Sequence, residues 1–252
     1  MLPACQVAFL SACWGQRHAA RLGLWLEAVH RAQIQKHTAI MCHDTAALAA
    51  CKARHRWPHL CADARDWPKS LLSKLVGLAL CLQLGLDVMW LDSDAVVLGD
   101  PRPFLVPIRT ASEEVEEQPE LLFSVEPDSW NCVNAGVFFA RSTQRVLRYF
   151  GFWIALFLMR PFSFDQAVLS MLLGLVKKMD FADFAAREQL LDVESPRPRA
   201  LGTLQTPVWG ALDGRAAFGM TAQIVTGGIQ PGATASLVIM HLLESWPNSS
   251  IP

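Results

Sequence analysis

The sequence has few charged side chains and no marked excess of either sign. Of its 252 residues, 18% are Asp, Glu, Lys or Arg, and the formal net charge is -1. Proteins that bind nucleic acid normally carry a clear positive excess, so we expect no nucleic-acid partner. The hydrophobic fraction of 52% excludes an intrinsically disordered chain.

Long hydrophobic runs are also lacking. A membrane-spanning helix needs about 20 apolar residues, and the longest candidates, 149–159 and 75–86, are too short. The N-terminus has no basic region of the kind that begins a signal peptide. We therefore expect a first buried strand there, and no membrane span within this chain.

Closely spaced cysteine pairs are missing as well. The seven cysteines form no Cys-x-x-Cys pair, and most lie in apolar runs. Disulfide frameworks and zinc sites normally have tighter spacing, so we expect buried reduced thiols. The cysteines are Cys5, Cys13, Cys42, Cys51, Cys61, Cys81 and Cys132.

What the first half does contain is a regular alternation of short apolar runs and segments of helical periodicity. Strand followed by helix, repeated along the chain, is typical of a mostly parallel α/β sheet with crossover helices. The expected strands are 7–12, 39–42 and 88–91, and the expected helices are 18–33, 45–54 and 69–84.

The second half is less regular. We expect strands at 121–125, 136–140 and 236–240, helices at 143–159 and 164–173, and a solvated acidic loop at 113–120. No linker separates the halves. We therefore expect one domain over 1–252, with a regular nucleotide-binding half (about 1–100) and an irregular substrate-binding half (about 101–252).

Two carboxylates follow the apolar run that ends at Leu91. Asp92 and Asp94 would lie at the C-terminal end of a buried strand, where ligands bind in open α/β sheets. In an extended chain residues i and i+2 project to one side, so both could address one Mg²⁺ or Mn²⁺ ion. The alternative is a pair of turn carboxylates that cap the following segment.

Several motifs in order resemble the nucleotide-diphospho-sugar transferase family, whose members have the GT-A fold and include plant and algal cell-wall xylosyl- and arabinosyltransferases. The resemblance spans about 7–241. It is carried by Lys74, Leu82, Gly85, Leu91-Asp92-Ser93-Asp94, Asp100-Pro101, Asn134-Ala135-Gly136 and Asp165-Gln166.

This resemblance implies a metal-dependent, retaining glycosyltransferase that uses a nucleotide-sugar donor, UDP-sugar by preference, and a glycan or glycoprotein acceptor. It implies that Asp94 binds the Mn²⁺ or Mg²⁺ ion and that Asp92 contacts the ribose or the metal. A late histidine is a further metal ligand in related enzymes, which implicates His241. An ordinary histidine at a strand end is the equal alternative.

The remaining candidates each have a structural alternative. The resemblance places Asp165 and Gln166 at the donor sugar, although 163–166 also fits a capping box at a helix start. Asn134 and Gly136, expected just before a strand, would contact the donor or simply form a turn. Lys74 would approach the nucleotide phosphates or be solvated. Tryptophans near expected loops, Trp14 among them, could stack on sugar rings or belong to the core.

Two other functions remain open from the sequence. The run 92–96, Asp-Ser-Asp-Ala-Val, also matches the nucleophile loop of haloacid-dehalogenase-type phosphatases, in which the first Asp attacks phosphorus. The residues after His241 include no Lys or Arg to clamp a diphosphate, so a non-catalytic domain that binds nucleotide sugar or glycan is the third possibility. Family resemblance suggests the Golgi lumen, yet we see no signal or anchor in this chain, so a fragment or a cytoplasmic protein is the alternative.

Overall fold

The structure is a computed structural model of the whole chain. It describes residues 7–67, 71–105, 120–125, 133–159, 168–169, 172, 209–211, 218–220 and 239–241, and the statements below concern these residues.

A seven-stranded mixed sheet forms the centre of the molecule, in the order β3-β2-β1-β4-β7-β6-β8. Strands β1, β2, β3 and β4 are parallel, and β8 is parallel to β6, whereas β7 runs antiparallel to both β4 and β6. The strands are β1 (Val7–Cys13), β2 (Thr38–Cys42), β3 (Cys61–Asp63), β4 (Asp87–Leu91), β6 (Leu121–Val125), β7 (Val133–Ala140) and β8 (Trp209–Ala211).

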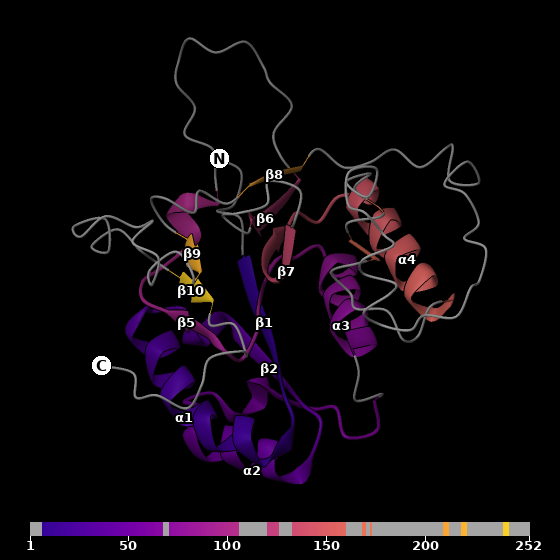
Figure 1. Cartoon of the computed structure of the whole chain (residues 1–252). Coiled ribbons are helices and arrows are strands. Elements are labelled where there is room, and N and C mark those ends of the chain that lie inside the picture. The colour runs from indigo at the N-terminus through magenta and orange to yellow at the C-terminus, as the bar shows by residue number, and fades with distance from the viewer. Residues whose placement is uncertain are drawn as a thin grey trace, which may run out of the picture.

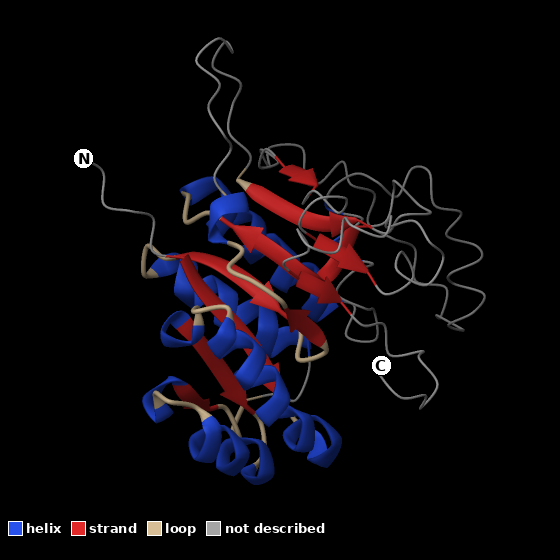
Figure 2. Cartoon of the chain, turned by 90° about the vertical axis from the view of Figure 1, so that its left-hand side faces the viewer, coloured by secondary structure: helices blue, strands red, loops and turns tan. Residues whose placement is uncertain are grey.

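Helices cover both faces of this sheet (Figure 1). Helices α1 (Gly15–Arg31) and α2 (Thr45–Arg54) pack on one face, and α3 (Leu71–Gln83) and α4 (Gln144–Met159) pack on the other. Three short 3-10 helices, η1 (Gln35–His37), η2 (Pro58–Leu60) and η3 (Arg102–Phe104), complete the helical elements described. Figure 2 shows the strands, in red, running side by side through the middle of the described part of the molecule.

The two faces arise from alternation along the strands. Met89 and Leu91 of β4 belong to the core under α1 and α2, whereas Val88 and Trp90 belong to the core under α3 and α4. Because successive strand residues point to opposite faces, a continuous apolar strand must be covered on both sides. This is why the run before the acidic pair is uninterrupted.

A small second sheet lies beside the first and has the order β5-β10-β9. It consists of β5 (Ala95–Val97), β9 (Phe218–Met220) and β10 (Ile239–His241). Strand β10 pairs antiparallel with β5, with His241 opposite Ala95. Residues near the end of the sequence therefore lie next to the segment that follows the acidic pair.

The expected fold class, a mostly parallel α/β sheet with helices on both faces, is confirmed. The short strands β3, β5, β8 and β9 were not predicted from the sequence, and β7 begins three residues earlier than expected. Three-residue strands leave too little periodicity to be recognised, and they form here because neighbouring strands supply their hydrogen bonds. The division into functional halves stays a prediction.

The expectation of reduced thiols is wrong for one pair. Cys51 of α2 and Cys61 of β3 form a disulfide with a Cα–Cα distance of 5.9 Å. Cys13, Cys42 and Cys81 are free, and the first two are buried as expected. The pairing was missed because the two cysteines are ten residues apart and meet only when the chain turns from α2 into β3. Cys5 and Cys132 lie outside the described residues.

Glu120, the last residue of the expected acidic loop, is buried and not solvated. Its Oε1 accepts a hydrogen bond from Thr143 Oγ1 at 2.7 Å, and its Oε2 lies 3.0 Å from Arg145 Nε. Glu120 therefore connects the start of β6 to the first turn of α4. The rest of the loop, 113–119, lies outside the described residues.

Within the described part of the chain, no helix is both long enough and apolar enough to cross a bilayer.

Candidate functional site

The chain reverses its direction of travel across the sheet between β1 and β4. From β1 it proceeds to β2 and β3 on one side, and then crosses to β4 on the other side of β1. Such a switch point opens a crevice beyond the C-terminal ends of the two strands, where ligands bind in open α/β sheets. Trp14 follows β1 and Asp92 follows β4, so both lie at this switch point.

The acidic pair lies in a tight turn and not in an extended strand. The Ala95 backbone N–H donates to the Asp92 carbonyl at 2.9 Å, which closes a turn over 92–95. The extended geometry assumed from the sequence is therefore wrong, because β4 ends at Leu91. Both carboxylates remain half-buried at the edge of the sheet, and neither is enclosed in the core.

The Asp92 carboxylate is held from the side of α3. Trp90 Nε1 donates to Asp92 Oδ1 at 2.5 Å, and Lys74 Nζ lies 3.8 Å from the same oxygen. Trp90 belongs to the core under α3, and Lys74 belongs to α3 itself, which explains how both groups reach this carboxylate. A hydrogen bond to an ionised carboxylate fixes its orientation more firmly than one to a neutral group.

Lys74 is buried, with 4% of its surface exposed, so the solvated alternative is wrong for this residue. Its Nζ donates to the Ala135 carbonyl of β7 and lies 5.0 Å from the ring centroid of Trp90. A buried ammonium needs such partners because desolvation disfavours its charge. Lys74 thus places a fixed positive charge directly behind the acidic turn.

Strand β7 supplies the other wall of this part of the site. The Asp92 backbone N–H donates to the Gly136 carbonyl at 2.8 Å. Asn134 and Gly136 were expected just before a strand, but they lie within β7. They are nonetheless next to the acidic turn, because β7 pairs with β4 up to Leu91.

Helix α1 contacts the turn from the opposite face. His18 Nδ1 and Ser93 Oγ are 3.0 Å apart, and Trp25 Nε1 donates to the Ala95 carbonyl at 2.8 Å. The turn therefore has hydrogen bonds to α1 on one face and to α3 and β7 on the other. Such bracing restrains a short acidic turn that like-charge repulsion would otherwise open.

Trp14 and its neighbours form an aromatic edge at the end of β1. The Trp14 side chain is 42% exposed, and its ring lies 6.0 Å from the rings of both His18 and His43. Asp44 fixes the backbone here, because its carboxylate accepts from Gly15 N at 2.5 Å and from Ala47 N at 2.8 Å. One carboxylate thus caps the first turns of both α1 and α2.

His43 is a structural link rather than a ligand of the site. It is 1% exposed; its Nδ1 lies 3.1 Å from the Ala64 carbonyl and its Nε2 lies 3.0 Å from Ser73 Oγ. Because a carbonyl can only accept, Nδ1 carries the proton and Nε2 accepts from the serine hydroxyl. The pair therefore connects the end of β2 to α3.

The described residues complete only part of the expected metal site. Among side chains that the structure describes, no group of three or more His, Cys, Asp or Glu residues could hold a metal ion. Residue 241 is described by its backbone, opposite Ala95 and therefore next to Asp94. Asp165 and Gln166 lie outside the described residues.

Comparison with known proteins identifies the family of this chain. Residues 33–192 match the model of the nucleotide-diphospho-sugar transferase family, which is more than half of the chain. The chain belongs to this family. By class it is a glycosyltransferase, and the phosphatase interpretation of 92–96 is set aside. No curated protein matches the sequence.

Solved structures show the same fold. The glycosyltransferase GlyE of Streptococcus pneumoniae TIGR4 aligns with a TM-score of 0.53 and 13% identity over 97% of this chain and 57% of that one. A glycosyltransferase involved in glycosylation of the major capsid of PBCV-1 aligns with a TM-score of 0.46 and 12% identity, over 95% and 94% of the two chains. The fold of this family member is the GT-A fold.

Three residues of the site were not among the expected site residues of this transferase. His18, Trp90 and Trp25 contact the acidic turn from α1 and β4. The only signal for Trp90 was its place two residues before Asp92, on the same side of a strand. Helix periodicity assigned Trp25 to the core and gave no signal for His18.

Proposed function

We propose that this transferase is metal-dependent, binds the diphosphate of a nucleotide-sugar donor at the acidic turn, and transfers the sugar to a hydroxyl of a glycan or glycoprotein. The observation that supports this most is the position of the turn. Asp92 and Asp94 lie half-buried beside the only reversal of strand order among β1 to β4. Ligands of open α/β sheets bind at such a crevice.

The donor set suits a hard divalent cation. Glycosyltransferases of this kind commonly use a divalent metal, and carboxylate oxygens are ligands that Mg²⁺ and Mn²⁺ accept. Asp94, Asp92 and His241 would hold the ion, with His241 supported by its register opposite Ala95. When bound, the ion would neutralise the negative charge that builds up on the leaving nucleoside diphosphate.

The protein itself would contribute orientation and fixed charge. Lys74 and Trp90 hold the Asp92 carboxylate from behind, so little reorganisation of the turn is needed when a donor binds. Preorganised charge of this kind stabilises a transition state more than the ground state. His18, through Ser93, would restrain the opposite side of the turn.

The donor base is assigned to the aromatic edge at β1. Trp14 is exposed at the end of β1, and β1 is the strand next to β4 in the sheet. A ring in that place can stack on a nucleobase while the diphosphate reaches the turn. UDP-sugar is the donor that we propose.

Asp165, Gln166 and Asn134 are proposed for the donor sugar. A carboxylate at Asp165 would stabilise the oxocarbenium-like charge that develops at the anomeric carbon, and the amides would orient the sugar hydroxyls. We further propose that the anomeric configuration is retained. Proton NMR of the first product formed would establish the anomer, and an inverted product would contradict this part of the proposal.

Thermal unfolding with UDP tests the metal-bridged site. We expect UDP to raise Tm in the presence of Mn²⁺ and to have little effect in EDTA, and we expect Asp94→Asn to remove the shift. Asp66→Asn, which removes an exposed carboxylate after β3, is the matched control and should keep the shift.

Three results would separate the alternatives. A UDP shift that is equal in Mn²⁺ and in EDTA would contradict the metal bridge. A metal-dependent shift without donor hydrolysis or transfer would identify a non-catalytic binding domain. Release of phosphate from para-nitrophenyl phosphate, lost in Asp92→Asn, would instead support a phosphatase.

We also propose that the protein works in the secretory pathway, in the Golgi lumen. The Cys51–Cys61 disulfide supports this, because disulfides persist in oxidising compartments and are rare in the cytosol. Mass spectrometry of the protein isolated from its own cells after thiol blocking tests it. Recovery of both cysteines as free thiols would contradict the proposal.

A further inference from the structure

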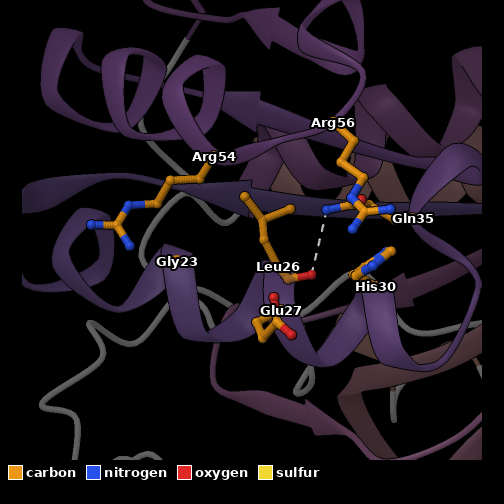
Figure 3. A pocket seen from close by; sticks show the side chains of 7 residues that line it. All are labelled: Gly23, Leu26, Glu27, His30, Gln35, Arg54 and Arg56. Atoms are coloured by element: carbon orange, nitrogen blue, oxygen red, sulfur yellow. Dashed lines mark hydrogen bonds between the residues drawn. The ribbon is translucent and has the colours of Figure 1, made fainter.

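A second polar pocket lies away from the acidic turn, between α1, α2 and η1. Its volume is about 230 Å³, and it is lined by Gly23, Leu26, Glu27, His30, Gln35, Arg54 and Arg56 (Figure 3). Residue 35 precedes β2, whereas the acidic turn follows β4, and the two strands run in the same direction. The pocket and the acidic turn therefore lie at opposite edges of the sheet.

Gln35 provides a hydrogen-bond acceptor that is buried and unmatched. The residue is 3% exposed, and its Nε2 donates to the Leu26 carbonyl at 3.4 Å. Its Oε1 is buried without a hydrogen-bond partner. Exchanging the two amide atoms would bring two carbonyl oxygens together, so the nitrogen belongs on the Leu26 side. Because a buried acceptor without a donor is costly, the pocket favours a ligand that brings a donor there.

Two guanidinium groups in the pocket need hydrogen-bond acceptors, whereas Gln35 needs a donor. Arg54 and Arg56 line the pocket, and neither has an ion-pair partner in the described part of the chain. Glu27 lines the same pocket but forms no ion pair with either arginine. In Figure 3 the Arg54 side chain lies over Gly23, while Arg56 lies near Gln35 and His30. Guanidinium groups have only donors, and their planar arrangement suits phosphate and carboxylate oxygens. Together with Glu27 they leave the lining with a net positive charge.

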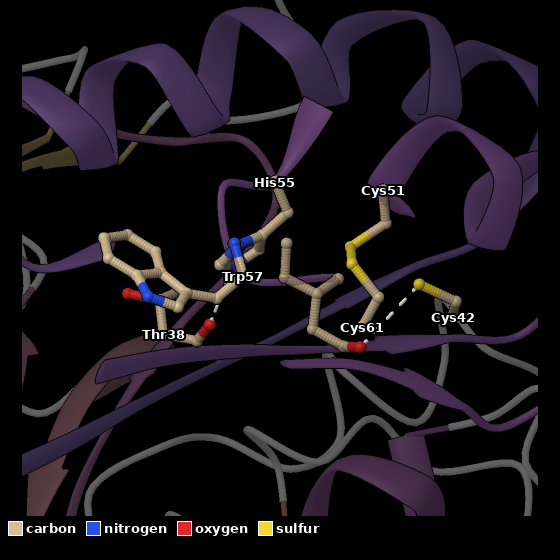
Figure 4. Close-up of a disulfide and its surroundings, with 7 residues drawn as sticks. Thr38, Cys42, Cys51, His55, Trp57 and Cys61 are labelled. Carbon is tan, nitrogen blue, oxygen red and sulfur yellow. Dashed lines mark hydrogen bonds between the residues drawn. A yellow bond between two sulfur atoms is a disulfide. The ribbon is translucent and has the colours of Figure 1, made fainter. Parts of the chain in front are cut away.

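The end of α2 and the residues that follow it, which carry the two arginines, are fixed in place. His55 lies between them and is buried; its Nε2 lies 3.0 Å from the Thr38 carbonyl, and its Nδ1 accepts from Trp57 N at 3.0 Å. The Cys51–Cys61 disulfide closes the same segment (Figure 4). The arginines therefore extend from a braced backbone, which lowers the entropy lost when a ligand orders them.

Gly23 makes room for the Arg54 side chain on α1. A Cβ atom at this position would lie 2.2 Å from Arg54 Nη1 and 2.8 Å from its Cδ and Cζ. Any larger residue would displace the guanidinium from its position over the helix. The pocket therefore combines a positioned cation, a second cation and a buried acceptor.

We propose that this pocket binds a phosphate monoester of a small polyol. The phosphate oxygens would accept hydrogen bonds from Arg54 and Arg56, and a hydroxyl of the polyol would donate to Gln35 Oε1. This ligand provides acceptors and a donor together, which a simple sulfate ion does not. The site is independent of the donor site proposed at the acidic turn.

Glycerophosphate is the test ligand, compared with sulfate at equal ionic strength and with glycerol. We expect glycerophosphate to raise Tm in a saturable way, by at least twice the sulfate shift, and glycerol to have no effect. Equal shifts with sulfate and glycerophosphate, or no shift with either, would overturn the proposal. The same Tm shift should be seen in EDTA and in Asp94→Asn, so that failure of the proposed metal site would not affect this test.

Three variants locate the effect. Gln35→Met and Arg56→Met should each reduce the affinity for glycerophosphate at least fivefold in calorimetric titration. Gly23→Ala should raise Tm of the free protein, because alanine favours a helix over glycine, and at the same time lower the affinity. Arg31→Gln, which removes an exposed cation of the same helix outside the pocket, is the control. Unchanged affinity in Arg56→Met and Gly23→Ala would overturn the proposal.

Discussion

Lys74 Nζ lies 3.8 Å from Asp92 Oδ1, and this ion pair connects the interior of helix α3 to the turn that follows β4. The lysine side chain is 5% exposed and the carboxylate side chain is 35% exposed. The lysine is therefore enclosed by protein on the inner side of the turn, whereas the carboxylate is partly open to solvent. Removing the lysine should affect the site more than it affects the fold.

We predict that Lys74→Met lowers kcat/KM at least about tenfold, equivalent to about 1.4 kcal/mol of transition-state stabilisation. The methionine fills the same space without a charge to desolvate, and Asp92 keeps its Trp90 bond, so the loss of Tm should be limited to that of the hydrogen bond to the Ala135 carbonyl. Steady-state kinetics with UDP-sugar and a thermal scan check both parts. Lys36→Met, an exposed lysine of η1, is the control. Equal kcat/KM in the wild type and Lys74→Met would show that this charge does not serve the reaction.

We predict that Trp14→Ala weakens UDP binding by roughly 1–3 kcal/mol, the range expected for loss of one base-stacking ring. Trp14→Phe should retain most of the affinity, because a smaller ring still stacks. Calorimetric titration with UDP and Mn²⁺ measures both variants. Leu24→Ala, at an exposed apolar residue of α1, controls for loss of surface area. If Trp14→Ala and Leu24→Ala bind UDP equally well, the base binds elsewhere.

We predict that replacing both Cys51 and Cys61 by serine lowers the free energy of unfolding by roughly 3 kcal/mol. This is the loop entropy that a crosslink over ten residues removes from the unfolded chain. Urea denaturation measures the change. Cys81→Ser, at a free half-buried cysteine, is the control. A reductant should destabilise the wild type but leave the double variant unchanged. A wild type whose free energy of unfolding is the same with and without reductant would show that the bridge does not form.

We predict that alkaline pH destabilises the protein through two thiols. Burial, and then the charge of Asp44, raises the pKa of Cys13 to about 12. Burial, and then the neighbouring Cys13, raises the pKa of Cys42 to about 12. Between about pH 8.5 and 12 the unfolded chain releases these protons and the folded chain keeps them. The free energy of unfolding should therefore fall as pH rises, by about 1.4 kcal/mol per pH unit for each thiol.

Urea titrations across pH 8 to 10 would measure this slope. The double variant with Cys13→Ala and Cys42→Ala should show a shallower decline, whatever its stability at neutral pH. Parallel declines in the two proteins would mean that other groups are responsible. Between pH 6 and 8 these two thiols should contribute no pH dependence.

The position of the acidic site could be predicted from the sequence. An apolar run that ends in Asp92 and Asp94 requires a buried strand with carboxylates at its end, because only a strand covered on both faces reads as continuously apolar. The backbone conformation of Asp92 and Asp94 could not be predicted. Strand β4 stops at Leu91, and the hydrogen bond from Ala95 to Asp92 makes a turn where an extended chain was expected.

Residues that reach the site from other elements were harder to predict. Lys74 is 18 positions before Asp92, and periodicity showed only that it lies on a helix. Its burial follows from the packing of α3 against β4 and β7. The Cys51–Cys61 bridge and the pocket at Gln35 depend in the same way on how α2 returns to the sheet.

The sequence by itself determined the order of the longer strands and helices, the fold class and the family, because local periodicity and ordered motifs are properties of the chain. Tertiary structure alone decided which groups surround the acidic turn, which cysteines are bonded and where the second pocket lies. These depend on contacts between elements far apart in the chain, and a linear pattern carries no distance between such elements.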